Sequence, residues 1–164
     1  MQIKNFVLTS LLAASILPAV AADTGGNTAK VRHRIEVETE GGRVLARVTV
    51  ENHSGEKIYF PREIAAEPEL SGRRFDVREL PSGTPLDYTG RMVKRGPPTA
   101  ADFQALGPHE VHLHTIDITN TYAFKKGRHS YELRYDGPWL ADVTRLDQVN
   151  ASPSAPVRFS YTGK

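Results

Sequence analysis

Residues 31–51 read VRHRIEVETEGGRVLARVTVE, and two parts of this stretch alternate apolar and polar side chains. In residues 31–38 every odd position holds valine, isoleucine or histidine, and every even position is charged. In residues 44–51 valine or alanine stands at every even position instead. Successive side chains of a strand point to opposite faces of its sheet. The stretch therefore predicts two strands, each with one face in a core and the other in water.

Shorter runs of the same kind extend the prediction along the chain. We expect further strands at residues 58–61, 75–80, 86–93, 111–118, 130–135 and 157–161. Residues 86–93 are expected to pair back onto residues 75–80 as a hairpin. Helical turns are predicted within residues 63–67 and 142–148, and a short helix at residues 99–106, where Asp102 follows the N-cap residue Thr99 by three positions.

These elements predict the fold class. Roughly seven to nine short strands, with no long amphipathic helix and no repeat, indicate an all-β protein. Their spacing favours an immunoglobulin-like antiparallel β-sandwich with one short helix, and an open barrel is the alternative. Tyr122 stands where such sandwiches place a tyrosine that ties a crossover to the neighbouring backbone, or it fills the core.

The N-terminus has the features of a cleaved signal peptide. Lys4 precedes an apolar run over residues 6–20, and Ala19-Val20-Ala21 supplies the small residues that a signal peptidase needs. We therefore expect residues 1–22 to be a signal peptide, residues 23–136 to be the sandwich domain, and residues 137–164 to be an extension that could add an edge strand. No membrane span is expected after cleavage.

Composition restricts the setting and the partners. The chain has no cysteine, which excludes disulfides and thiolate chemistry and favours a bacterial periplasmic or secreted protein over a eukaryotic secreted one. The 21 Lys and Arg residues nearly balance 19 Asp and Glu residues, which argues against nucleic acid as a partner. Basic groups within residues 73–74, 91–95 and 125–128 could form a docking patch or could be solvated turn charges.

Histidines suggest the one candidate metal site. Residues 109–114 read HEVHLH, but a zinc-protease helix needs its two histidines four positions apart, and position 113 is leucine. On a strand, His112 and His114 would share a face and could ligate a metal with a third group, or they could form a surface pair. The sequence also lacks a nucleophile elbow, a phosphate-binding glycine loop and a Ser-x-x-Lys motif, so we predict a protein that is not an enzyme and has no cofactor.

One longer pattern resembles a known family. Residues 75–77, 86–95, 98–103, 106–118 and 131–135, together with Tyr122 and Gly127, resemble in order and spacing the N-terminal, propeptide-like domain of the deuterolysin-type (aspzincin, peptidyl-Lys) metalloendopeptidases. The sequence departs from the family at His109, where glycine is usual. It also lacks the catalytic domain with its paired zinc histidines, so no metal ligand can be transferred.

The resemblance implies a noncatalytic domain that binds a secreted zinc metalloprotease as an inhibitor or folding chaperone. The first candidates for contact with that partner are Arg91, Lys94, Arg95, Asp102 and Phe103. An edge strand of the sandwich could also accept an extended segment of the enzyme.

Two other functions stay open. An immunoglobulin-like adhesion or glycan-binding module would use exposed aromatic side chains, for which the candidates are Tyr59, Phe60, Tyr88 and Trp139. A small periplasmic metal-binding protein would use His112 and His114.

Overall fold

The computed structural model describes residues 29–164, and the predicted signal peptide lies outside them. Within this range the chain forms ten strands, one short α-helix and one 3₁₀ turn. The longer strands are β1 (Val31–Glu40), β2 (Arg43–Asn52), β4 (Asp76–Leu80), β6 (Val111–Asp117), β7 (Gly127–Arg134) and β10 (Val157–Gly163). The shorter elements are β3 (Ile58–Pro61), α1 (Arg62–Ala65), η1 (Ala100–Asp102), β5 (Phe103–Leu106), β8 (Pro138–Trp139) and β9 (Asn150–Ala151).

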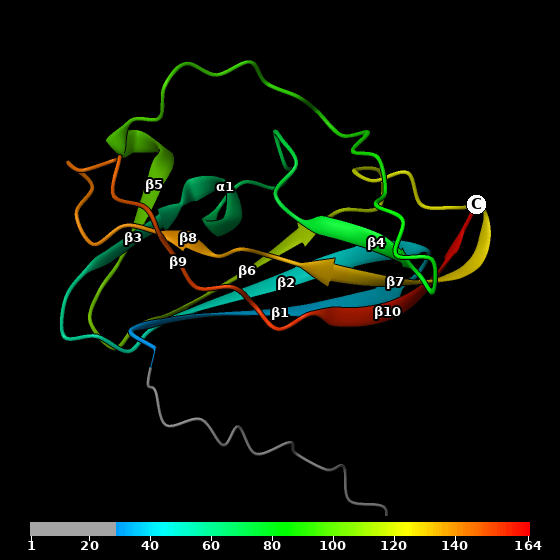
Figure 1. Cartoon of the computed structure of the whole chain (residues 1–164), viewed down its shortest axis with the longest axis horizontal. Helices are drawn as coiled ribbons and strands as arrows, with labels where there is room; N and C mark the ends of the chain where they lie inside the picture. The colour runs from blue at the N-terminus through cyan, green and yellow to red at the C-terminus, as the bar shows by residue number, and fades with distance from the viewer. Residues whose placement is uncertain (1–28) are drawn as a thin grey trace, which may run out of the picture.

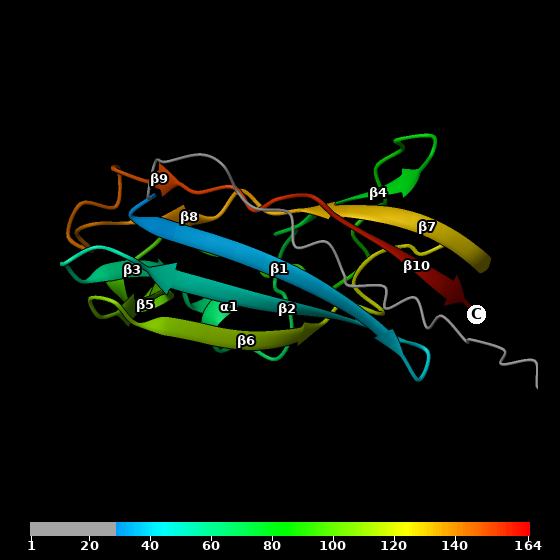
Figure 2. The ribbon, with the colours of Figure 1, turned by 90° about the horizontal axis from the view of Figure 1, so that it is seen from below.

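Two antiparallel three-stranded sheets organise these elements. One has the strand order β1-β2-β6 and the other has the order β10-β7-β4. Figure 1 looks onto the β10-β7-β4 sheet, with β1 and β2 crossing behind it, and Figure 2 shows β1 running beside β10. The pairs β3-β5 and β8-β9 lie with α1 at the end of the molecule away from the C-terminus (Figure 1). The structure thus confirms the all-β class with antiparallel sheets and one short helix, which is α1 and lies at a different place from the helix expected at residues 99–106.

The period-two pattern forms the core as predicted. Strands β1 and β2 pair along their whole length, from Val31 opposite Asn52 to Glu40 opposite Arg43, around the turn at residues 41–42. The four even-numbered valine and alanine side chains of residues 44–50 are at most 1% exposed. Burial of one valine stabilises the fold by roughly 1.5–3 kcal/mol. One hydrophobic cluster joins these side chains to Val77, Tyr131 and Leu133 of the other sheet.

The strand order also bears on the predicted architecture. In immunoglobulin domains the first strand pairs with the second, and the second with the fifth, while the third, sixth and seventh strands form the opposing sheet. The orders β1-β2-β6 and β10-β7-β4 match this scheme if the short strands are set aside and the fourth strand of the scheme has no counterpart in residues 29–164. The strand order agrees with the predicted immunoglobulin-like sandwich, which stays a prediction.

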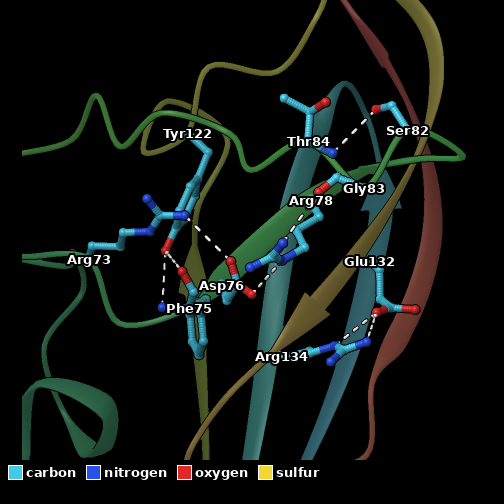
Figure 3. A network of polar contacts seen from close by, with 10 residues as sticks. All are labelled: Arg73, Phe75, Asp76, Arg78, Ser82, Gly83, Thr84, Tyr122, Glu132 and Arg134. Atoms are coloured by element: carbon cyan, nitrogen blue, oxygen red, sulfur yellow. Dashed lines mark hydrogen bonds and ion pairs between the residues drawn. The ribbon is translucent and has the colours of Figure 1, made fainter.

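Tyr122 ties the connection between β6 and β7 to the start of β4. Its hydroxyl donates a hydrogen bond to the Phe75 carbonyl at 2.8 Å and accepts one from the Phe75 amide at 3.1 Å. Figure 3 shows the hydroxyl directed at this backbone, beside the ion pair of Arg73 and Asp76. Burial raises the pKa of Tyr122 to about 12, so the hydroxyl stays protonated. Tyr122 therefore both ties the crossover to the neighbouring backbone and fills the core, where it is 2% exposed.

Three local predictions were wrong. Residues 86–93 form no strand: Pro85 makes one isolated bridge with Arg78 of β4, and Tyr88 makes one with Tyr122, which lies outside the strands. The expected helix at residues 99–106 is only the turn η1, after which the backbone becomes extended at Phe103 and pairs with β3 as β5. Residues 142–148 form turns held by Asp142 side-chain hydrogen bonds rather than a helical turn.

Near the C-terminus, strand β10 forms one edge of its sheet. Strand β10 pairs with β7 from Val157 opposite Leu133 to Gly163 opposite Gly127. Tyr161 buries its ring and donates a hydrogen bond to the Gly42 carbonyl at 2.9 Å, which links β10 to the β1-β2 turn. None of the helices within residues 29–164 has the length and apolar character needed to cross a bilayer.

Candidate protein-binding site

A groove of about 860 Å³ lies between α1, η1 and the irregular segment at residues 91–99. The segment arches away from both sheets before it enters η1 and β5 (Figure 1). Proline, valine and phenylalanine side chains form much of the wall, and two arginines and two acids lie among them. The lining residues are Pro61, Glu63, Arg74, Val93, Arg95, Gly96, Pro97, Pro98, Thr99, Asp102 and Phe103.

The floor of the groove is a buried carboxylate. Glu63 is placed there by α1, and its side chain is 2% exposed. Arg74 donates to it from Nε at 2.7 Å and contacts it through a second nitrogen at 2.6 Å, while Ser71 donates from its amide and from its hydroxyl. A buried charge needs this degree of pairing to be tolerated. The four hydrogen bonds fix residues 71–74 against the helix.

The same network reaches the exposed segment through Arg95. Its guanidinium donates to the Ser71 hydroxyl at 2.6 Å and lies 3.5 Å from the carboxylate of Asp102. Asp102 in turn accepts hydrogen bonds from the Thr99 amide at 2.8 Å and hydroxyl at 3.0 Å. These bonds, the Thr99 amide first, and the nearby Arg95 charge lower the pKa of Asp102. Both ends of residues 95–102 are therefore fastened.

Met92 is the most exposed large apolar side chain in residues 29–164, at 80%. The peptide group before it is held because the Tyr88 hydroxyl donates to the Arg91 carbonyl at 2.8 Å. The peptide group after it is held because the Val93 amide donates to the Ser71 carbonyl at 3.1 Å. The chain thus presents a flexible apolar side chain on a backbone that is fixed on both sides.

The structure brings together three of the five predicted contact residues. Arg95, Asp102 and Phe103 line the groove, whereas Arg91 and Lys94 are exposed on the adjoining segment. Within residues 29–164 neither of these two cations has an acidic partner in an ion pair. The segment from 91 to 95 therefore combines Met92 with two uncompensated positive charges.

Sequence reasoning missed Met92 and Glu63, and it named Arg74 only as part of a possible basic patch, without its pairing to Glu63. Met92 had a local signal, because it is an apolar residue among cations, but it fell within the strand wrongly predicted at residues 86–93. Glu63 and Arg74 had none, because their pairing depends on the path of the chain between α1 and β4.

The two candidate metal ligands, His112 and His114, share one face of β6, as predicted. Each directs Nε2 at a backbone carbonyl, His112 at Ala65 over 2.8 Å and His114 at Glu67 over 2.9 Å. Because a carbonyl only accepts, both Nε2 atoms carry hydrogen. The pair fastens α1 and the residues after it to β6. Across residues 29–164, no three His, Asp or Glu side chains are arranged to hold a metal.

The predicted aromatic platform is wrong. Phe60 is fully buried, and Tyr59, Tyr88 and Trp139 are half-buried. Trp139 packs against the core, and the Tyr88 hydroxyl is used by backbone carbonyls. These four side chains do not form an exposed surface on which a sugar ring could stack.

Comparisons with known proteins identify no family. No protein-family model matches the sequence, and a search of curated proteins found no significantly similar one. The resemblance to the deuterolysin-type N-terminal domain stays a prediction.

Proposed function

We propose that this chain is an exported, noncatalytic domain that binds a secreted zinc metalloprotease of the deuterolysin type, as its inhibitor or folding chaperone. Residues 91–95 are the centre of the contact surface, and the groove lined by Arg95, Asp102 and Phe103 accepts side chains next to it. The observation that carries the proposal is Met92, an exposed apolar side chain with both flanking peptide groups held.

Preorganisation is what makes this segment suitable for binding. Ordering a loop during association costs free energy, and a segment that is already held in place avoids much of that cost. An unbranched thioether side chain fits varied apolar pockets. Arg91 and Lys94 would steer the segment towards a cleft with acidic walls, because complementary charge raises the association rate.

The backbone at His109 supports the family resemblance. His109 has a φ of 59° and is the one non-glycine residue with positive φ in residues 29–164. This left-handed region is the one that favours glycine, which is the residue usual at this position in the deuterolysin-type domain. A glycine would adopt this φ without strain, so the glycine usual in the family would fit the same turn, and histidine is among the side chains that tolerate it.

The test uses the purified processed protein and a deuterolysin-type endopeptidase. We expect the two to co-elute, and either the peptidase activity falls, which indicates an inhibitor, or the refolding yield of the denatured enzyme rises, which indicates a chaperone. Met92→Glu should weaken the complex at least about tenfold, as expected for a central apolar anchor. Val149→Glu is the matched control, because Val149 is also an exposed apolar side chain, at 56%, and lies outside the segment.

Failure to form a complex with any enzyme of this class would overturn the proposal. Equal binding by Met92→Glu and the unaltered protein would instead show that the contact surface lies elsewhere.

A further inference from the structure

Strand β6 ends its sheet, because the strand order is β1-β2-β6. It pairs with β2 without interruption, from Leu45 opposite Asp117 to Glu51 opposite Val111. Natural edge strands are usually shortened, bulged or marked by lysine or proline, which prevents pairing with another chain. The seven residues VHLHTID contain none of these features.

The direction of each backbone group on β6 follows from the pairing at its ends. The Asn52 amide donates to the Glu110 carbonyl, and the Ile118 amide donates to the Val44 carbonyl. Hydrogen-bonded and non-hydrogen-bonded pairs alternate in an antiparallel ladder. The even-numbered residues of β6 therefore bond to β2, and the odd-numbered residues direct their amides and carbonyls at the open edge. These residues are Val111, Leu113, Thr115 and Asp117.

The side chains of the same four residues lie on the outer face of the sheet. Val111 is 64% exposed and Leu113 is 57% exposed, so two of the large exposed apolar side chains of residues 29–164 stand on one edge strand. The inner face is already used, since His112 and His114 bond to the residues around α1. The edge thus offers backbone groups that have no partner within residues 29–164, together with an apolar outer surface.

We propose that two copies of this chain pair through their β6 edges, antiparallel across a two-fold axis, and form a continuous six-stranded sheet. In the register centred on Leu113, that side chain lies opposite Leu113 of the second copy. Val111 of each copy lies opposite Thr115 of the other, which gives two equivalent pairs. All three pairs are hydrogen-bonded pairs, because odd-numbered residues face the edge on both copies.

Charge favours a second copy in this register. Asp117 is the one acidic or basic side chain on the outer face of β6, since the two histidines of this strand lie on its inner face. Antiparallel pairing places the two Asp117 side chains at opposite ends of the paired segment, whereas parallel pairing would bring them together. Each Asp117 lies opposite His109 of the other copy, and the carboxylate of the neighbouring Glu110 is already used by the Gly107 amide of its own chain. A two-fold contact of this kind is closed and cannot grow into a fibre.

Single cysteines test the register, because the chain has none of its own. Opposite residues of a hydrogen-bonded antiparallel pair have Cα atoms about 5.5 Å apart, which is within the range for a disulfide. Leu113→Cys should therefore form a covalent dimer rapidly under mild oxidation. Val149→Cys is the matched control, since the two positions are 57% and 56% exposed, and it should cross-link much more slowly.

Sedimentation of the cysteine-free protein over a range of concentrations tests the dimer itself. We expect a reversible monomer–dimer equilibrium, which Leu113→Lys should abolish and Val149→Lys should leave unchanged. Thr115→Pro should also abolish the dimer. It removes an amide that faces the open edge, and this amide makes no hydrogen bond to β2 that the substitution could break. A chain that stays monomeric, with Leu113→Cys cross-linking no faster than the control, overturns the proposal. Loss of metalloprotease binding in Thr115→Pro without any dimer would assign the edge to that partner instead, which also overturns it.

Discussion

Lowering the pH from 7 to 4 should destabilise the fold by about 3 kcal/mol through one histidine, His33. The ring is 3% exposed on the inner face of β1, and Tyr135 meets it edge-on with centroids 5.5 Å apart. Neither ring nitrogen has a hydrogen-bond partner within residues 29–164. Burial lowers the pKa of His33 from 6.5 to about 4, and the nearby Ser152 backbone, which does not reach hydrogen-bond geometry with the ring, acts in the opposite direction.

The magnitude follows from the difference between the two pKa values. One unit corresponds to about 1.36 kcal/mol, so a shift from 6.5 to about 4 gives about 3 kcal/mol. The folded protein favours the neutral ring, so its pKa lies below that of the unfolded chain. The stabilisation is therefore complete above pH 6.5 and is lost as the pH falls from 6.5 to about 4.

The neighbours of His33 do not supply a compensating charge. The ring packs against Tyr135 and the backbone of Gly137, and Val50 of β2 lies opposite His33 in the ladder. The charged groups that act on Tyr135 are Arg74, Glu63 and Asp136, and the first two are already paired with each other. A protonated His33 would have no carboxylate of its own inside the core.

Urea unfolding at pH 7, 6, 5 and 4 measures the effect. The comparison is with His33→Phe, which keeps an aromatic ring against Tyr135 and removes both unpartnered nitrogens. Carboxylates such as Glu79 and Glu132, whose pKa values are lowered by their cationic partners, contribute equally to both proteins. The free energy of unfolding should fall by about 3 kcal/mol more in the unaltered protein. Parallel pH profiles, or a ring that titrates near pH 6.5 by NMR, would refute the reasoning.

Three further predictions follow from single contacts. Arg74→Met should lower the unfolding free energy by about 3–5 kcal/mol because it leaves the buried Glu63 carboxylate without its cationic partner. Glu63→Gln should lower it less, because Arg74 is 43% exposed and can be solvated. Urea unfolding of the two variants measures this difference. Tyr122→Phe should cost about 1–3 kcal/mol, since both backbone groups of Phe75 lose their partner in the core, and the thermal midpoint records the loss. Tyr88→Phe should weaken the metalloprotease complex several-fold with little change in the thermal midpoint, because it frees the exposed segment; equal affinity by calorimetry would contradict this.

The strands with a strong two-residue period could be predicted from sequence because burial alone determines them. In residues 31–37 and 44–50, every second side chain belongs to the core. A shift of the pairing register by one residue would turn these side chains towards the solvent. Residues 86–93 contain apolar side chains with a similar rhythm but form no strand. There, Leu86 is buried beside β4, and Tyr88 directs its hydroxyl at backbone carbonyls instead of continuing a ladder. Local pattern does not reveal that no partner strand is available.

The groove shows the same limit. Arg95, Asp102 and Phe103 could be predicted as neighbours because they lie within nine positions of one another. The Glu63 carboxylate beneath them could not, because its contacts with Ser71 and Arg74 arise from the way α1 packs on β6. His33 is an intermediate case. Its position in the alternation of β1 predicts that it is buried, but its lack of a hydrogen-bond partner depends on how Tyr135 and the β8-β9 region pack against it.

The exposed apolar side chains favour two separate contact surfaces. The five large ones in residues 29–164 are Met92, Val93, Val111, Leu113 and Val149. Isolated exposed apolar residues need no explanation, but four of these five occur as two close pairs. One pair stands on a segment whose backbone is already hydrogen-bonded and whose other side chains are cations, which suits an acidic partner. The other pair stands on β6, which pairs with β2 on one side only, and whose outer face carries Asp117 as its one charged side chain, which suits its own copy. The two surfaces differ in the hydrogen bonding of their backbones and in the charge of their side chains. One kind of partner would therefore not suit both surfaces.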